Sequence, residues 1–138
     1  MAWFDAMHVS LSSLEASRAR MEAAASNLSN ADSSARDDGS LYQVQRVSIQ
    51  ENRTEDPQGP SVVAGVRHEL HQMNLPPRLH YDPGHPDADE QGMVRYPDVD
   101  IVTEMSELIN SRRAYDAALS AYSESRSMFL KTLEIGKT

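Results

Sequence analysis

Residues 101–133 read IVTEMSELINSRRAYDAALSAYSESRSMFLKTL, and this segment carries an apolar pattern sustained over more than four heptads. Alternating steps of four and three residues select one row of positions, which comprises Ile101, Met105, Leu108, Arg112, Tyr115, Leu119, Tyr122, Arg126, Phe129 and Leu133. All but the two arginines are large apolar or aromatic residues. Because a spacing of 3.5 residues keeps one stripe facing a partner helix, this row predicts a coiled-coil-like seam on a helix of roughly 50 Å. Asp98 or Asp100 can cap its start, and Gly136 suits its end.

A second row of the same kind lies near the N-terminus. It comprises Phe4, Met7, Leu11, Leu14, Arg18, Met21, Ala25 and Leu28. This row predicts a helix over about residues 3–29, which the polar and turn-prone run after Asn30 brings to an end. The two rows are called the N-terminal seam and the C-terminal seam below.

The prolines separate the two seams. All seven lie between Pro57 and Pro97, and proline is excluded from helix interiors because it lacks an N–H and clashes with the preceding turn. Both ends of the chain can therefore be long helices, whereas the middle cannot. We expect a mainly α fold with a small β insertion, in which residues 1–32 and 98–138 carry the helices and residues 33–97 form the connecting, β-rich segment.

Short strands are predicted within this middle segment. Residues 41–50 carry alternating Val and Ile on each side of Arg46, where a change of phase suggests a bulge or a bend. Residues 62–70 place apolar side chains at alternate positions. Two further short strands are expected to pair across a turn-rich connection, with Leu79 and Tyr81 on one and Val94 and Tyr96 on the other.

The composition excludes several classes of protein. The chain has 138 residues, which suits one domain, and 13 Lys and Arg against 21 Asp and Glu give a net charge of -8. This acidic balance argues against nucleic-acid binding, which requires a surplus of basic side chains. No stretch approaches the ~18 apolar residues of a membrane span, and we find no Sec-type signal peptide. The absence of cysteine removes disulfides, zinc–thiolate sites and cysteine nucleophiles.

Neither seam can be buried by the small β insertion alone. A two-helix hairpin also hides only one side of each helix, and both helices carry many Ala and Ser residues off the seam. These features predict oligomerisation, with helices from several subunits side by side. Arg18, Arg112 and Arg126 occupy seam positions. Each either meets a carboxylate in a register-setting ion pair or extends to the surface along its apolar stem.

A group of histidines and aspartates is the main candidate for chemistry. It comprises His68, His71, His80 and His85 with Asp82, Asp87 and Asp89. Such side chains can bind zinc or another transition metal, but neighbours such as His68 and His71 would point to opposite faces of a strand. Asp87-x-Asp89-x-Gln91-Gly92 approaches a calcium loop, yet nearby prolines preclude its flanking helices. We favour surface histidines and an acidic turn, and therefore predict no metal, no cofactor and no catalytic residue.

Other motifs resemble a known family. Ser26-Asn-Leu-Ser-Asn-Ala-Asp32 at the end of the N-terminal helix resembles a segment of the bacterial flagellar axial proteins, and the matching residues are Asn27, Leu28, Asn30, Ala31 and Asp32. Residues 81–89 (YDPGHPDAD), 97–100 (PDVD), 111–117 (SRRAYDA) and 128–133 (MFLKTL) are similar to the proximal rod members of that family. Ser29 departs from the pattern, and residues 51–78 show no match.

The resemblance implies a structural role in the flagellar basal body. Subunits of this family would be exported unfolded by the flagellar type III apparatus and would assemble in the periplasm. Their partners would be copies of the same chain, other rod proteins and the adaptor between the rod and the membrane ring at its base. The terminal helices would form the inner tube of the torque-transmitting rod. A metal-dependent periplasmic enzyme that uses the His/Asp group and a coiled-coil adaptor are the alternatives.

Overall fold

The computed structural model describes residues 2–34, 38–54 and 62–136. Two long helices occupy the ends of this chain, namely α1 (Ala2–Asn30) and α2 (Ile101–Ile135). Both contain their predicted ranges, so the heptad spacing identified each helix correctly. The expected fold class, mainly α with a β insertion, is confirmed.

Asp100 is the residue that caps α2. Its carboxylate accepts hydrogen bonds from the Thr103 hydroxyl at 2.8 Å and from the N–H groups of Val102 and Thr103 at 3.0 and 3.4 Å. These bonds hold the pKa of the Asp100 carboxyl below its ordinary value, with the Thr103 hydroxyl as the main cause. At the other end, the Gly136 N–H donates to the Thr132 carbonyl at 3.2 Å.

The insertion consists of two antiparallel hairpins. The long hairpin pairs β1 (Val44–Thr54) with β2 (Val62–Met73), and the short hairpin pairs β3 (Arg78–Tyr81) with β4 (Met93–Tyr96). The first strand was expected over residues 41–50, and β1 instead begins at Val44 and ends at Thr54.

Two details of strand register differ from the expectation. The irregularity in the long hairpin lies between Asn52 and Arg53 rather than at Arg46. In the short hairpin, Leu79 and Tyr81 lie opposite Arg95 and Met93, one residue away from the expected partners. The connecting turn sets this register, because the Asp82 N–H donates to the Gly92 carbonyl and the Asp89 N–H donates to the Met93 carbonyl.

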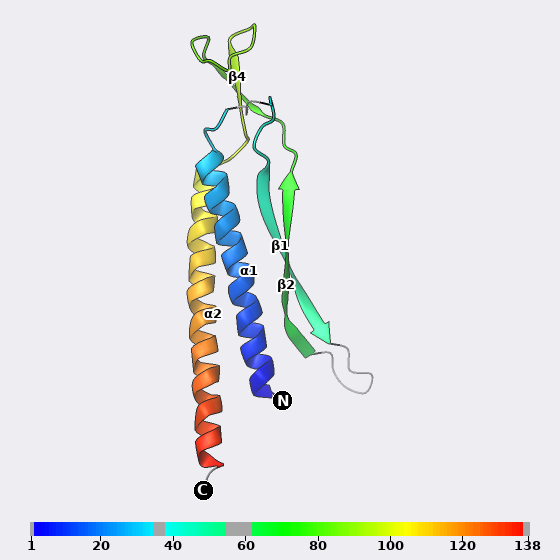
Figure 1. Ribbon diagram of the computed structural model, residues 1–138, viewed down its shortest axis with the longest axis vertical. Coiled ribbons are helices and arrows are strands. Elements are labelled where there is room, and N and C mark those ends of the chain that lie inside the picture. Colours follow the sequence, from blue (N-terminus) through cyan, green and yellow to red (C-terminus); the bar gives the residue numbers. More distant parts are fainter. Residues whose placement is uncertain (1, 35–37, 55–61, 137–138) are drawn as a thin grey trace.

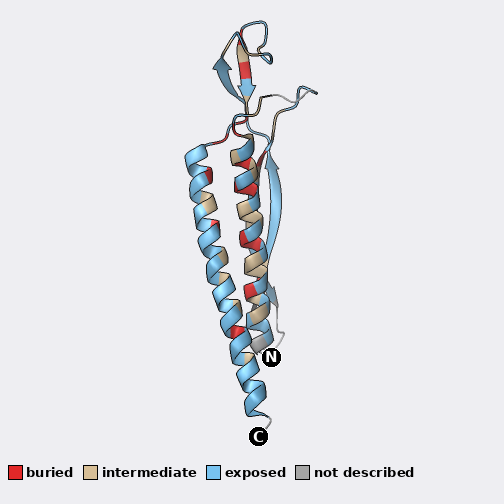
Figure 2. Cartoon of the chain, turned by 60° about the vertical axis from the view of Figure 1, so that its left-hand side comes forward, coloured by how far each residue is buried: buried red, intermediate tan, exposed pale blue. Residues whose placement is uncertain are grey.

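The elements form a row (Figure 1). α1 lies in the middle, with α2 along one side and the long hairpin along the other, while the short hairpin lies beyond the helices at one end of the long axis. α2 extends past the N-terminal end of α1 at the other end of the molecule. Because α1 is packed along its length between both neighbours, most of the buried helical positions belong to α1 (Figure 2).

The core of the described chain is thin and made of small side chains. Its buried apolar residues are Ala16, Ala23, Ala24, Ala31, Val44, Val94 and Val99. The large apolar side chains of both helices remain half-buried or exposed. A single chain therefore leaves much of its apolar surface uncovered.

The long hairpin contacts α1 closely at Gly65. A Cβ at this position would lie 2.8 Å from the Ser12 hydroxyl, and the φ of +143° also favours glycine. The Ser12 hydroxyl accepts a hydrogen bond from the Val66 N–H at 3.0 Å, and His8 Nδ1 donates to the Ala64 carbonyl at 3.0 Å. Side chains of α1 thereby provide hydrogen-bond partners for backbone groups on the edge of β2 that does not pair with β1, next to the register irregularity of the long hairpin.

Candidate subunit-packing surfaces

The stripe of α2 that faces α1 coincides with only part of the C-terminal seam. Its buried and half-buried members are Glu104, Glu107, Leu108, Ser111, Tyr115, Ala118, Tyr122, Ser125 and Phe129. Four of them, the bulky apolar ones, belong to the predicted seam. The other positions that contact α1 are mostly small, because small side chains let the two helix backbones approach. Glu104, Ser111, Ala118 and Ser125 also recur every seven residues in the sequence. A seam defined by large apolar residues does not include them.

The other half of the C-terminal seam is exposed in a single chain. Met105 and Leu119 are 53% and 48% exposed, and Ile101, Arg112, Arg126 and Leu133 are exposed as well. Each of Met105, Arg112, Leu119 and Arg126 directly follows a member of the stripe on α1, so it is turned away by about 100°. This apolar row has no covering element among the described residues.

The N-terminal seam is divided in the same way. Met7, Leu14, Met21 and Leu28 are half-buried, while Phe4, Leu11, Arg18 and Ala25 are exposed. The two seams meet at Phe4 and Phe129, whose rings pack edge to face with centroids 5.2 Å apart. Higher along the helices, a groove of about 490 Å³ is lined by Met21, Leu108, Ile109, Arg112 and Arg113.

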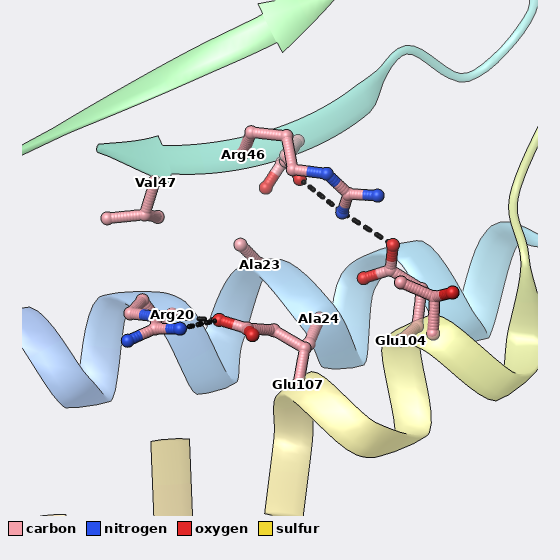
Figure 3. A pocket seen from close by; sticks show the side chains of 9 residues that line it. Arg20, Ala23, Ala24, Arg46, Val47, Glu104 and Glu107 are labelled. Carbon is pink, nitrogen blue, oxygen red and sulfur yellow. Dashed lines mark hydrogen bonds and ion pairs between the residues drawn. The ribbon is translucent and has the colours of Figure 1, made fainter. Parts of the chain in front are cut away.

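Two of the three seam arginines, Arg18 and Arg112, find partners along their own helices. Arg18 Nε lies 2.8 Å from Glu22, and hydrogen bonding to this carboxylate raises the pKa of Arg18. Arg112 lies 3.2 Å from Asp116. The ion pair that does connect the helices is Arg20 with Glu107, at 2.5 Å and off the seam (Figure 3).

A buried polar junction holds together α1, β1 and α2. Asn27 is fully buried and uses its whole amide group: Nδ2 donates to the Gln45 carbonyl at 2.9 Å and to Glu104 Oε2 at 3.0 Å. Its Oδ1 accepts from the Gln45 N–H at 2.8 Å and from the Tyr42 hydroxyl at 2.9 Å. One side chain of α1 therefore fixes the start of β1 against the first turn of α2.

Glu104 is the acidic member of this junction. Its side chain is 1% exposed, and Oε1 lies 2.5 Å from Arg46 Nη1 of β1 (Figure 3). The contact is an ion pair without the alignment of a hydrogen bond, so charge attraction provides the stabilisation. A cavity of about 190 Å³ beside it is lined by both Arg–Glu pairs and by Ala23 and Ala24. A paired buried carboxylate is strongly destabilising once its partner is removed.

The motif residues that carry the family resemblance surround this junction. Asn27 is the central residue of the junction. Leu28 is half-buried, and Asn30 Nδ2 donates to the Ser26 carbonyl at 2.8 Å. Ala31 packs in a small buried cluster with Val44 and Val99. Asp32 lies 3.5 Å from Arg78 of β3. In this structure, the motif joins the end of α1 to the elements around it.

The histidines and aspartates do not form one site. His68 and His71 lie on β2, whereas His80 and His85 belong to the short hairpin. Across residues 2–34, 38–54 and 62–136, no three His, Asp or Glu side chains are grouped so that they could hold a metal ion.

Two carboxylates of the acidic turn accept hydrogen bonds. Asp89 accepts hydrogen bonds from the N–H groups of Gln91 and Met93, each at 2.9 Å, and Asp87 accepts from the Ser34 hydroxyl at 2.5 Å. The Asp89 bonds stabilise the turn, whereas the Ser34–Asp87 bond joins the turn to the segment that follows α1. None of the helices in the described part of the chain is long and apolar enough to cross a membrane.

The chain is similar to known proteins along nearly its whole length. Residues 90–135 match the family described as "Flagellar basal body rod FlgEFG protein C-terminal". The flagellar basal-body rod proteins FlgC of Escherichia coli O6:H1 and of Salmonella typhimurium are each 36% identical over 138 residues, which cover 99% of this chain and 100% of theirs. FlgC of Aquifex aeolicus is 36% identical over 134 residues, 97% of each chain. The similarity thus extends over both helices and the insertion between them.

Proposed function

This chain belongs to the FlgC family of flagellar basal-body rod proteins, and we propose that its exposed seam residues are the contacts through which it assembles. It is a structural subunit of the flagellar rod, located in the periplasmic part of the basal body. The observation that carries the proposal is the uncovered apolar row on both helices of an otherwise folded chain. Exposed large apolar side chains that gather along one side of a helix mark a protein–protein interface.

The proposed role is mechanical rather than catalytic. α1 and α2 form the inner tube of the rod together with the helices of neighbouring subunits, and both hairpins lie outside it. Tightly packed helices resist deformation, which is the property that a torque-transmitting shaft requires. The row of elements supports this arrangement, because α2 and the long hairpin lie on opposite sides of α1 (Figure 1).

Leu119→Asp tests the assembly surface. Leu119 is 48% exposed in the single chain, so the substitution should leave the isolated fold intact, but it would bury an unpaired charge in the assembled rod. We expect non-motile cells whose purified basal bodies lack the rod beyond this subunit. Leu70→Asp on β2 is the matched control, because Leu70 is 53% exposed and lies outside both seams. Wild-type swimming of the Leu119→Asp strain would contradict the proposal.

Membership of the rod family also bears on how the subunit is exported and on which proteins it contacts. We propose export through the flagellar type III apparatus in an unfolded state and contact with the adaptor at the base of the rod. The thin core of alanine and valine supports easy unfolding, since little apolar surface is buried. Fusion of a very stable domain to the chain should block its export, and periplasmic accumulation of the folded fusion would refute this route.

A further inference from the structure

Two opposite sides of α2 carry complementary side chains. The positions directly after Glu104, Ser111, Ala118 and Ser125 form one side, called the leucine face, with Met105, Arg112, Leu119 and Arg126. The positions directly before them form the other side, called the alanine face, with Thr103, Asn110, Ala117 and Glu124. All of these residues are exposed.

The two faces lie on opposite sides of the row of elements. Since each residue is turned by 100° from the one before, the positions after and before the stripe on α1 point about 200° apart. The linings of the two hollows agree with this geometry. Arg112 lines the groove beside Met21, whereas Thr103 lines the cavity beside Arg46.

Matching positions on the two faces are almost level. Leu119 and Ala117 differ by two residues, which is about 3 Å along the helix. The same offset relates Arg126 to Glu124, and neither of these charged groups has an ion-pair partner within the described part of the chain. Two copies placed side by side at equal height would therefore set a large side chain against a small one and a cation against an anion.

We infer that the leucine face of one subunit packs against the alanine face of α2 in a second copy of this chain, with the two helices parallel. Leu119 fits against Ala117, whose small side chain allows close helix approach, and Arg126 pairs with Glu124. The contact joins unlike surfaces, so it leaves a free face at each end and continues from copy to copy into a ring or a helical wall. This inference rests on the proposed function and specifies which faces meet.

Disulfide cross-linking tests the contact, because the natural chain has no cysteine. Leu119→Cys and Ala117→Cys are produced as two chains with different tags in one strain, and the oxidised basal bodies are analysed for dimers. We expect dimers that contain both tags, since facing positions bring the two Cα atoms within the ~7 Å that a disulfide requires. Each variant alone should give little dimer. Leu70→Cys, on β2, is the control for random collision.

Charge exchange gives a second and independent readout. Arg126→Glu or Glu124→Arg alone should reduce the yield of the mixed disulfide about tenfold, because like charges then face each other. The double variant should restore the yield, since every copy carries both residues. Arg67→Glu, at an exposed position on β2, should have no effect.

The possible outcomes separate the inference from the proposed function. Rods that contain both cysteine variants without a mixed dimer overturn the inference alone, and so do dimers formed equally well by Leu119→Cys with itself, which would show that two leucine faces meet each other. Failure of the double charge variant to recover also counts against it. Absence of the unsubstituted chain from purified basal bodies would overturn both.

Discussion

Replacing Asn27 by alanine tests the polar junction that joins α1, β1 and α2. The Tyr42 hydroxyl keeps a hydrogen bond to Ser26, and the Gln45 carbonyl keeps a long contact with Arg46 at 3.3 Å. The Gln45 N–H and Glu104 Oε2, however, lose the partner that the structure gives them. A buried polar group without a partner costs about 1–3 kcal/mol, so the two together predict a loss of about 2–6 kcal/mol in the free energy of unfolding.

Urea unfolding of the purified full-length chain, followed by far-UV circular dichroism, measures this loss. With a denaturant slope of about 1–3 kcal/mol per molar, we expect the midpoint to fall by at least about 0.7 M. Asn52→Ala on β1 is the matched control, because Asn52 is exposed, and its effect should stay within about 0.5 kcal/mol. A loss below about 1 kcal/mol for Asn27→Ala would refute the view that this amide holds the three elements together.

Three further predictions concern other parts of the fold. Gly65→Ala should destabilise the chain by about 1–3 kcal/mol in the same urea assay, and removing the clash with Ser12→Ala should not fully restore stability, because the φ of +143° remains unsuitable for alanine. The pKa of Asp100 is lowered by hydrogen bonds, chiefly from the Thr103 hydroxyl, so its stabilising effect is present above its unfolded pKa of about 3.9 and is lost as the pH falls through the folded value; Asp100→Asn should therefore lower the melting temperature at pH 7 more than at pH 3. Phe129→Ala removes a half-buried ring from the edge-to-face pair and should cost about 2 kcal/mol by thermal unfolding, whereas an unchanged melting temperature would contradict the helix contact.

The helices, the strands and the pairing of the short hairpin were predictable because their signals are local. A spacing of 3.5 residues located α1 and α2 to within two residues at each end, and the position of the prolines confined the strands to the middle. The register of the strand pairs was harder to predict from the sequence. The pairing of Leu79 with Arg95 depends on the hydrogen bonds of the turn, which apolar alternation does not reveal.

Local patterns of residues specify two long helices with apolar seams, a β insertion between them and the family to which their motifs point. Which half of each seam is covered follows from the packing of the folded chain, because contact between helices depends on how closely two backbones approach and not on hydrophobicity alone. Ser111 is therefore buried against α1 while Leu119 is exposed. The junction of Asn27 with Glu104 was likewise beyond the sequence, since 77 residues separate the two side chains and only folding brings them together.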